Sequence, residues 1–196
     1  MKAAFVIFDG MTALDFVGAY DPLTRLKSMR LVPGFEWRTC AFTTNVSDDK
    51  GLPFKPDLAG APLNEYDLIF VPGGFSTRTL QYDKTFIGWL RTSQPVKLKT
   101  SVCTGSLLLG AAGFLKNKRA TTHPSAFEEL RPYCAQVLDQ RVVDEREVVT
   151  ARGVTSAIDL GLYLVERLAG AEARARVAKQ MDYPYVWQGT QGTNAI

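Results

Sequence analysis

The chain has 196 residues, 46% of them apolar and 22% charged, so a single α/β domain over residues 1–196 is large enough to bury a core without help from a metal or a disulfide. The net charge is only +3 and no run of five like charges occurs, which argues against a nucleic-acid-binding surface. No signal peptide precedes the first strand and no apolar stretch approaches the ~18–20 residues of a membrane span, so we expect a cytoplasmic protein with no membrane partner.

The first half of the chain alternates between strand and helix patterns. Four stretches are short and apolar, or alternate as strands do: residues 3–8, 35–42, 66–74 and 96–102. Two stretches have apolar residues near helical spacing: residues 12–26 and 79–93.

The second half continues the alternation with shorter elements. The predicted elements are a strand end at 119–123, a short helix at 124–133, strands within 136–152 with a hairpin at Asp144-Glu145, a helix at 154–170, and a solvated helix face at 171–180. This order predicts a mostly parallel sheet with helices on both faces. In such sheets ligands bind beyond the carboxyl ends of the strands, where Asp9-Gly10, residues 72–74 and Cys103 all fall.

The stretch "LKTSVCTGSLLLGAAG" at 98–113 places Cys103 between a buried strand and the start of a helix. Such a junction forces a tight turn, a nucleophile elbow, and the helix N-terminus favours a thiolate over a thiol. We therefore predict that Cys103 is a strained, cleft-exposed nucleophile of lowered pKa. The alternative is a buried structural thiol.

Negative charge that develops during attack by a thiolate needs hydrogen-bond donors. The candidates are the Thr104 N–H and the backbone N–H groups of Gly73 and Gly74, since glycine lets main chain approach a substrate closely. The "PGG" at 72–74 is otherwise explained as a turn that ends a strand.

Three cysteines (Cys40, Cys103, Cys134) are an odd number without a CxxC pair, so we expect neither a disulfide framework nor a metal site. Cys40 lies inside a predicted strand and Cys134 follows Pro132, and both are interpreted as structural.

The segments "FVPGG" (70–74), "SVCTGSLLLGAAGFLKNKRATTHPSAFEEL" (101–130) and "GVTSAIDLGLYLVERLAG" (153–170) resemble the DJ-1/PfpI superfamily. Within it, "DGMTALDFVGAYDPL" (9–23) and "CTGSLLLGAAG" (103–113) are most similar to the isonitrile hydratase branch. The resemblance covers nearly the whole chain. It implies a flavodoxin-like three-layer α/β sandwich that works as a homodimer.

The resemblance also bears on Asp15 and Thr104. Asp15 stands where the glyoxalase and deglycase members carry a glutamate, and the isonitrile hydratases carry an aspartate there too. A carboxyl there would lie within hydrogen-bond reach of Cys103, with its pKa raised by burial and by the thiolate, and would act as acid and base. Its alternative role is to cap the helix. In the PfpI proteases a histidine follows the cysteine and serves as its base. Thr104 stands in that place here, which argues against a protease function.

His123 is the only histidine and so the only imidazole available for catalysis. The resemblance places it near the elbow, where it either takes part in catalysis and substrate binding or is structural. Pro124 follows it where the hydratase branch often has tryptophan, which weakens the assignment of the substrate but not of the fold.

The leading hypothesis is hydration of a small-molecule isonitrile to an N-substituted formamide, with Cys103 as nucleophile, Asp15 as proton donor and water activator, and no cofactor. The alternatives are a DJ-1-like glyoxalase or deglycase acting on 2-oxoaldehydes, and a redox-sensing stress protein. The aromatic segment with Tyr183, Tyr185 and Trp187 lines either the cleft or the dimer surface, and the tail after Gly189 is expected to be disordered.

Overall fold

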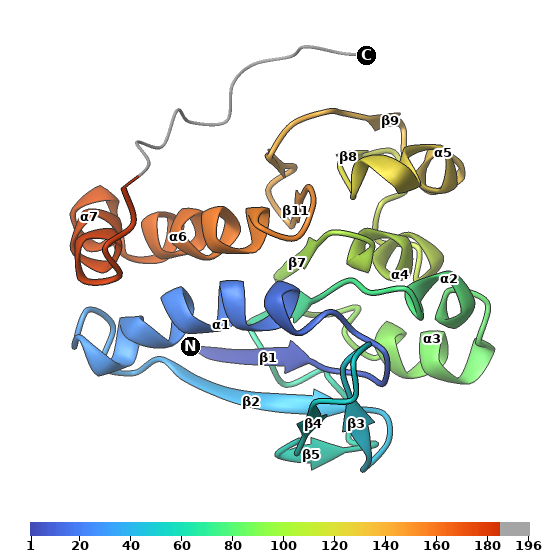
Figure 1. Ribbon diagram of the computed structural model, residues 1–196, viewed down its shortest axis with the longest axis horizontal. Helices are drawn as coiled ribbons and strands as arrows, with labels where there is room; N and C mark the ends of the chain where they lie inside the picture. Colours follow the sequence, from blue (N-terminus) through green and yellow to red (C-terminus); the bar gives the residue numbers. More distant parts are fainter. Residues whose placement is uncertain (185–196) are drawn as a thin grey trace.

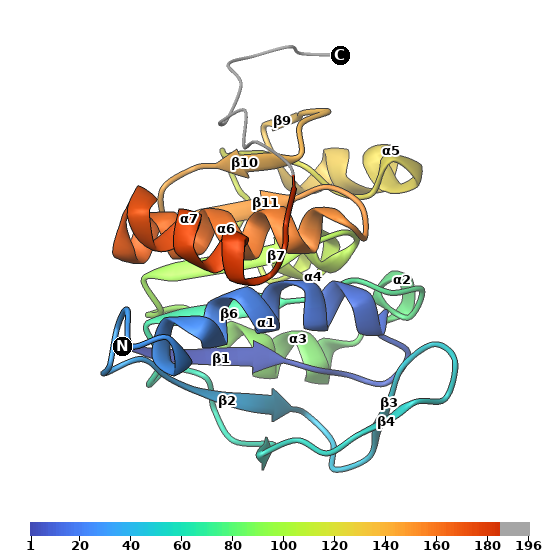
Figure 2. The same cartoon turned by 60° about the vertical axis from the view of Figure 1, so that its left-hand side comes forward.

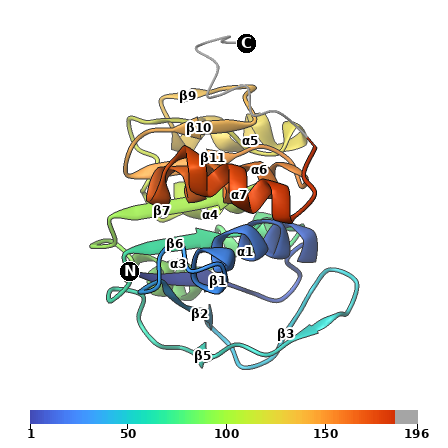
Figure 3. The same cartoon turned by 90° about the vertical axis from the view of Figure 1, so that its left-hand side faces the viewer.

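A computed structural model describes residues 1–184. Its centre is a seven-stranded sheet in the order β10-β11-β7-β6-β1-β2-β5, which Figure 3 shows running from β10 near the top to β5 near the bottom. The strands are β1 (Lys2–Val6), β2 (Glu36–Ala41), β5 (Leu58–Ala59), β6 (Leu68–Val71), β7 (Leu98–Val102), β10 (Val142–Asp144) and β11 (Val148–Ala151). All neighbouring strands are parallel except the β10–β11 hairpin. The predicted mostly parallel α/β sheet is confirmed.

Two small sheets lie outside the central one. β3 (Val46–Ser47) and β4 (Pro53–Phe54) form an antiparallel hairpin, and β8 (Arg119–Ala120) pairs in parallel with β9 (Gln136–Val137). The hairpin predicted at Asp144-Glu145 is confirmed, because β10 ends at Asp144 and the chain turns over 145–147.

Helices cover both faces of the sheet (Figures 1 and 2). One face carries α1 (Ala13–Ser28), α6 (Ser156–Ala169) and α7 (Ala171–Gln180), and the other carries α3 (Lys84–Arg91) and α4 (Gly105–Ala111). Near α4 lie α2 (Thr77–Leu80) and α5 (Phe127–Leu130), the latter flanked by 3-10 turns at Pro124–Ala126 and Arg131–Tyr133. In the described part of the chain, no helix is both long enough and apolar enough to cross a membrane.

The helix predicted over residues 79–93 is wrong in one respect, because it is two helices. Asp83 has an extended backbone and its carboxylate accepts the N–H groups of Thr85 and Phe86, at 2.8 and 3.1 Å. This cap begins α3 and separates it from α2. The apolar residues on either side of Asp83 keep helical spacing, so the sequence pattern does not indicate the break between the two helices.

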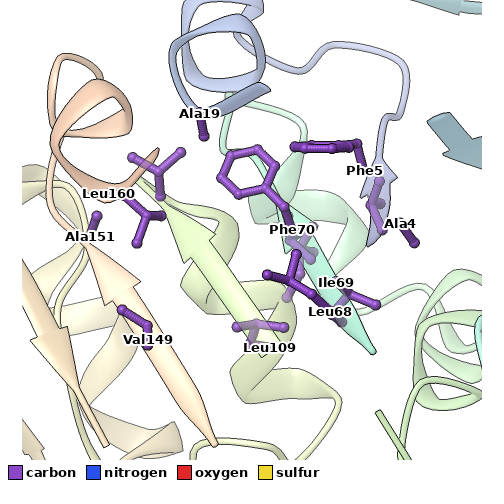
Figure 4. Close-up of a cluster of buried hydrophobic side chains, with 14 of the residues drawn as sticks. Ala4, Phe5, Ala19, Leu68, Ile69, Phe70, Leu109, Val149, Ala151 and Leu160 are labelled. Atoms are coloured by element: carbon purple, nitrogen blue, oxygen red, sulfur yellow. The ribbon is translucent and has the colours of Figure 1, made fainter. Parts of the chain in front are cut away.

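The core fills both faces of the central sheet, and on one face it lies between the sheet and the α1–α6 pair. Figure 4 shows Ala19 of α1 and Leu160 of α6 close to Phe70 and Ala151 of the strands. Phe5 packs against Phe70 with ring centroids 5.8 Å apart, and such aromatic pairs add to the energy of apolar burial. Because the strands run parallel, the ends of β1, β6 and β7 meet at one edge of this core.

Candidate active site

Cys103 follows the last residue of β7 and has a left-handed backbone, with φ of 54°. Its N–H donates to the carbonyls of Ala151 and Arg152, at 3.0 and 2.6 Å, and its own carbonyl accepts the hydroxyls of Ser106 and Thr122. A non-glycine residue in this conformation costs about 1–3 kcal/mol, so the surrounding hydrogen bonds must hold it in place. The predicted elbow is confirmed.

The predicted exposure and lowered pKa of Cys103 are wrong. The residue is only 6% exposed, and burial, followed by the nearby charge of Asp15, raises the pKa of its thiol to about 12. The N–H and hydroxyl of Thr104 lower this pKa, but their effect is smaller than that of burial. Desolvation of the thiol outweighs the favourable effect of the helix N-terminus on the thiolate. Cys103 therefore rests as a thiol and needs a base when it reacts.

Asp15 lies in the first turn of α1 and is fully buried beside Cys103. Its Oδ2 accepts the N–H of Gly73 at 3.0 Å, while its Oδ1 has no hydrogen-bond partner among residues 1–184. Burial raises the pKa of Asp15 to about 6, against the opposing effects of the Cys103 thiol and the Gly73 N–H. The predicted raised pKa is confirmed with burial as its cause, whereas the predicted contribution of Cys103 is wrong, because the hydrogen bond with the thiol lowers the pKa of Asp15. The carboxylate bonds to a residue 58 positions away, so its alternative role as a cap of α1 is not what the geometry shows.

Thr104 and the two glycines join β6 to the elbow. The Thr104 hydroxyl lies 3.1 Å from both the N–H and the carbonyl of Gly74, accepting from the first and donating to the second. Both glycine amides, which the sequence suggested as donors to substrate, therefore bond side chains of the site instead. The Thr104 N–H is the amide that bonds to the sulfur of Cys103.

Glycine is required at position 73 because the site leaves no room for a side chain. A Cβ there would stand 2.6 Å from the Thr104 nitrogen, 2.8 Å from Oδ2 of Asp15 and 2.8 Å from Cβ of Cys103. Gly74 has φ of 144° and packs equally tightly against the main chain of Gly10 and Met11. The double glycine is thus more than the end of a strand.

His123 caps the 3-10 turn that follows it. Its Nδ1 accepts the Ser125 N–H at 3.2 Å and lies 2.8 Å from the Ser125 hydroxyl, and its ring lies close to Gly153. Of the described side chains, those that shift the pKa of Cys103 are Asp15 and Thr104. The structural interpretation of His123 is the one this geometry favours.

Two site neighbours were not anticipated from the sequence. Thr122 holds the Cys103 carbonyl at 3.0 Å, and Asp49, from the β3–β4 turn, places a negative charge near Asp15. Thr122 belongs to the "TTHP" segment and could have been found there. No periodicity or motif marks Asp49.

Tyr183 bonds Asp159 of α6 through its hydroxyl, whereas Tyr185, Trp187 and the tail after Gly189 lie outside the described residues. Within residues 1–184, no group of three or more His, Cys, Asp or Glu side chains is arranged to hold a metal ion.

Comparison with known proteins finds relatives that match almost the whole chain. The profile of the DJ-1/PfpI family matches residues 1–167. An isonitrile hydratase of Pseudomonas putida is 34% identical over 185 residues, covering 93% of this chain and 78% of the relative. A glutathione-independent glyoxalase DJ-1 of Schizosaccharomyces pombe is 32% identical over 69% of this chain and 70% of its own length. The crystal structure of a ThiJ/PfpI family protein from Pseudomonas syringae superposes with a TM-score of 0.85, at 29% identity, over 98% of this chain and 78% of that one.

Proposed function

Because the chain belongs to the DJ-1/PfpI family, we propose that it is a cysteine-dependent enzyme that hydrates an isonitrile to an N-substituted formamide. The observation that carries the proposal is the buried Asp15–Cys103 pair, with Thr104 after the nucleophile. At neutral pH this pair holds one proton, which resides on sulfur because the pKa of Cys103 is raised far above that of Asp15. A thiol beside a carboxylate suits addition of sulfur and hydrogen to one carbon.

The first step forms the carbon–sulfur bond. Asp15 takes the thiol proton as Cys103 attacks the terminal carbon of R–N≡C, and the proton is then delivered to that same carbon. The product is a thioimidate, R–N=CH–S, on Cys103. A carboxylate with a pKa of about 6 is a better base than an ordinary aspartate, and the Thr104 N–H stabilises negative charge on sulfur.

The second step releases the product. Asp15, again ionised, removes a proton from a water molecule as the water oxygen adds to the thioimidate carbon and the nitrogen becomes protonated. The tetrahedral adduct R–NH–CH(OH)–S then breaks its carbon–sulfur bond, which gives R–NH–CHO and returns the thiol to Cys103. The balance is one isonitrile and one water consumed for one formamide formed.

The test is formamide production from a simple aryl isonitrile by the wild type and by Cys103→Ala. We expect product from the wild type alone, and Asp15→Asn should lose about 10²–10⁴-fold in kcat/KM. Absence of formamide from the wild type, or full activity in Cys103→Ala, would reject the proposed reaction.

The similarity to a glutathione-independent glyoxalase supports a second candidate, the conversion of 2-oxoaldehydes through a hemithioacetal on Cys103. Asp15 is one methylene shorter than the glutamate of the glyoxalase branch, which alters its reach to the substrate carbon. Lactate production from methylglyoxal, measured beside formamide production, separates the two activities.

Redox sensing is the third candidate, and the site supports it least. Oxidation to sulfenic acid proceeds from an accessible thiolate, whereas Cys103 is buried and its pKa is raised. Mass spectrometry after mild peroxide treatment should find Cys103 no more oxidised than Cys40.

We also propose that the protein is a cytoplasmic homodimer. Leu14 and Val17 lie three residues apart on α1 with 44% and 40% of their surfaces exposed, and Leu52 of the β3–β4 turn is 55% exposed. Apolar side chains exposed on neighbouring segments are typical of an interface. Sedimentation should report twice the mass of one chain, and a Leu14→Lys/Val17→Lys variant should sediment as a monomer.

A further inference from the structure

The β3–β4 hairpin is fastened to the loop that leads into α1 and the site. Asp9 accepts the N–H and hydroxyl of Ser47, at 3.0 and 2.7 Å, and the Gly10 N–H donates to the Ser47 carbonyl. Two residues after Ser47, the Asp49 N–H donates to the carbonyl of Met11 at 2.9 Å. Figures 1 and 2 both show the hairpin beside the loop between β1 and α1.

The hairpin also packs against α1 next to the catalytic carboxyl. The ring of Phe54 meets that of Phe16 edge-on, with centroids 5.7 Å apart, and Phe16 adjoins Asp15 in the sequence. Contacts on both sides of Asp15 therefore fix the position of the hairpin turn, residues 48–52, relative to the site.

Two carboxylates lie in this turn, and they have different partners. Asp48 accepts the backbone N–H groups of Lys50 and Leu52, at 2.9 and 2.8 Å, so it stabilises the turn itself. The side chain of Asp49 is 18% exposed and, within residues 1–184, forms its ion pair with Lys50, at 2.6 Å, whose own side chain is 75% exposed. A pair held by so exposed a lysine is screened by water and neutralises Asp49 incompletely.

We propose that Asp49 is a specificity-determining residue of this site, whose negative charge at the hairpin turn favours neutral or cationic reactants over anionic ones. The backbone hydrogen bond of Asp49 to Met11 and the packing of Phe54 on Phe16 keep this carboxylate beside the segment that carries Asp15. The charge of Asp49 adds to the raised pKa of Asp15. Among the described residues, Lys50 pairs with Asp49 and Asp15 is affected by its charge. The preferred isonitriles are those without a carboxylate in R, and in this respect the inference rests on the proposed function.

Alkylation of Cys103 tests the charge effect without any turnover. Iodoacetate and iodoacetamide react with the same thiol but differ in charge, and the ratio of their rate constants is read by mass spectrometry of the Cys103 peptide. Asp49→Asn should raise the iodoacetate-to-iodoacetamide ratio by about 2- to 3-fold, as expected for the weak interaction of two unit charges through a polar medium. Glu172→Gln on α7 removes an equal charge from an exposed position and should leave the ratio unchanged.

Two further measurements complete the test. In 0.5 M salt the difference between Asp49→Asn and the wild type should shrink, because the Debye length falls to a few ångströms. Lys50→Gln should lower the iodoacetate-to-iodoacetamide ratio, because it removes the positive charge that partly neutralises Asp49. An unchanged ratio in folded Asp49→Asn, or an equal change in Glu172→Gln, overturns the inference.

With isonitriles the same variant should gain about 2- to 3-fold in kcat/KM for an isocyanoacetate relative to its methyl ester. If neither compound is hydrated by the wild type, the proposed function fails while the alkylation ratio still decides the role of Asp49. If both are hydrated and Asp49→Asn leaves their ratio unaltered, the function stands and the inference fails.

Discussion

Cys103 and Asp15 each have a pKa raised by burial, to about 12 and about 6, so at neutral pH Asp15 is ionised, as the base must be, while Cys103 is still a thiol and must lose its proton to react. The thiol is too weak an acid to ionise at neutral pH, and the carboxylate beside it is an unusually strong base for an aspartate. The two groups act together because one proton can be passed between them.

This pair predicts the pH dependence of turnover. Asp15 must be ionised to accept the thiol proton, so kcat/KM should fall about tenfold per pH unit as the pH drops below about 6. Initial rates of isonitrile hydration between pH 4.5 and 8 measure the profile. A profile that stays flat down to pH 5 would contradict the assignment of Asp15 as the base.

Gly73 offers a test of the geometry at the same site. In Gly73→Ala the new methyl would collide with Thr104, Asp15 and Cys103, so we expect kcat/KM to fall at least about 100-fold, as small displacements of catalytic groups do. Gly88→Ala on α3 is the control, because its Cβ would meet nothing within 4 Å and activity should be retained. Equal activity in the two variants would show that the crowding at Gly73 has no catalytic consequence.

Some features of the site could be predicted from the sequence and others could not. The elbow at Cys103 was predictable because a strand, a turn and a helix follow one another within the stretch 98–113. The pKa of its thiol was not, since that depends on burial beneath α1 and on a carboxylate 88 positions earlier in the chain. The amides of Gly73 and Gly74 were predicted as donors to substrate, whereas their partners in the structure are the side chains of Asp15 and Thr104, which come from distant elements.

At the scale of elements, the contact between α1 and α6 determines where Asp15 stands. The two helices approach closely at Gly18, where a Cβ would lie 2.7 Å from that of Ala157, and at Gly161, where it would lie 2.7 Å from the ring of Pro22. Small residues at these two points let α1 settle onto α6, and α6 begins just after the strand whose carbonyls hold Cys103.

We expect Gly18→Ala to lower the free energy of unfolding by about 1–2 kcal/mol, because crowding against α6 outweighs the gain in helix propensity. Urea denaturation measures the loss. The double variant Gly18→Ala/Ala157→Gly should be closer to wild type than the sum of its single changes, since it removes the methyl group that is crowded. Additive losses in the double variant would mean that the two residues do not meet.

The elements themselves were largely predictable, with instructive failures. The strands at 3–8 and 66–74 are apolar because helices cover both faces of the sheet, and such runs are visible in the sequence. Residues 79–93 were predicted as one helix, since the cap at Asp83 interrupts the backbone without interrupting the apolar spacing. The two-residue strands β3 and β4 carry no periodic signal, and Asp49 was missed with them.

For the whole molecule, the buried carboxyl of Asp15 carries a cost in stability. Its pKa is about 6 in the folded protein and near 4 in the unfolded chain, so the folded state binds this proton more tightly. The stabilisation from protonation is present below pH 4 and is lost as the pH rises through 6. Above pH 6 the folded state bears the full cost of a buried charge, up to about 3 kcal/mol.

Asp15→Asn should therefore be more stable than the wild type at pH 8, and the difference should vanish toward pH 4. An asparagine side-chain oxygen still accepts the N–H of Gly73, so packing is retained. Thermal unfolding of both proteins at pH 4, 6 and 8 provides the comparison. A variant less stable than wild type at pH 8 would contradict this expectation and show that the ionised carboxyl stabilises the fold.

The hydrogen bonds that the Cys103 N–H makes to Ala151 and Arg152 also set an order of events during synthesis. The partners of the elbow leave the ribosome well after the cysteine itself, since β7 cannot pair with β11 until that strand has emerged. Until then Cys103 is an ordinary thiol on an incomplete sheet, open to any electrophile in its surroundings. Loss of reactivity toward a bulky maleimide would thus mark the moment at which a nascent chain closes its central sheet.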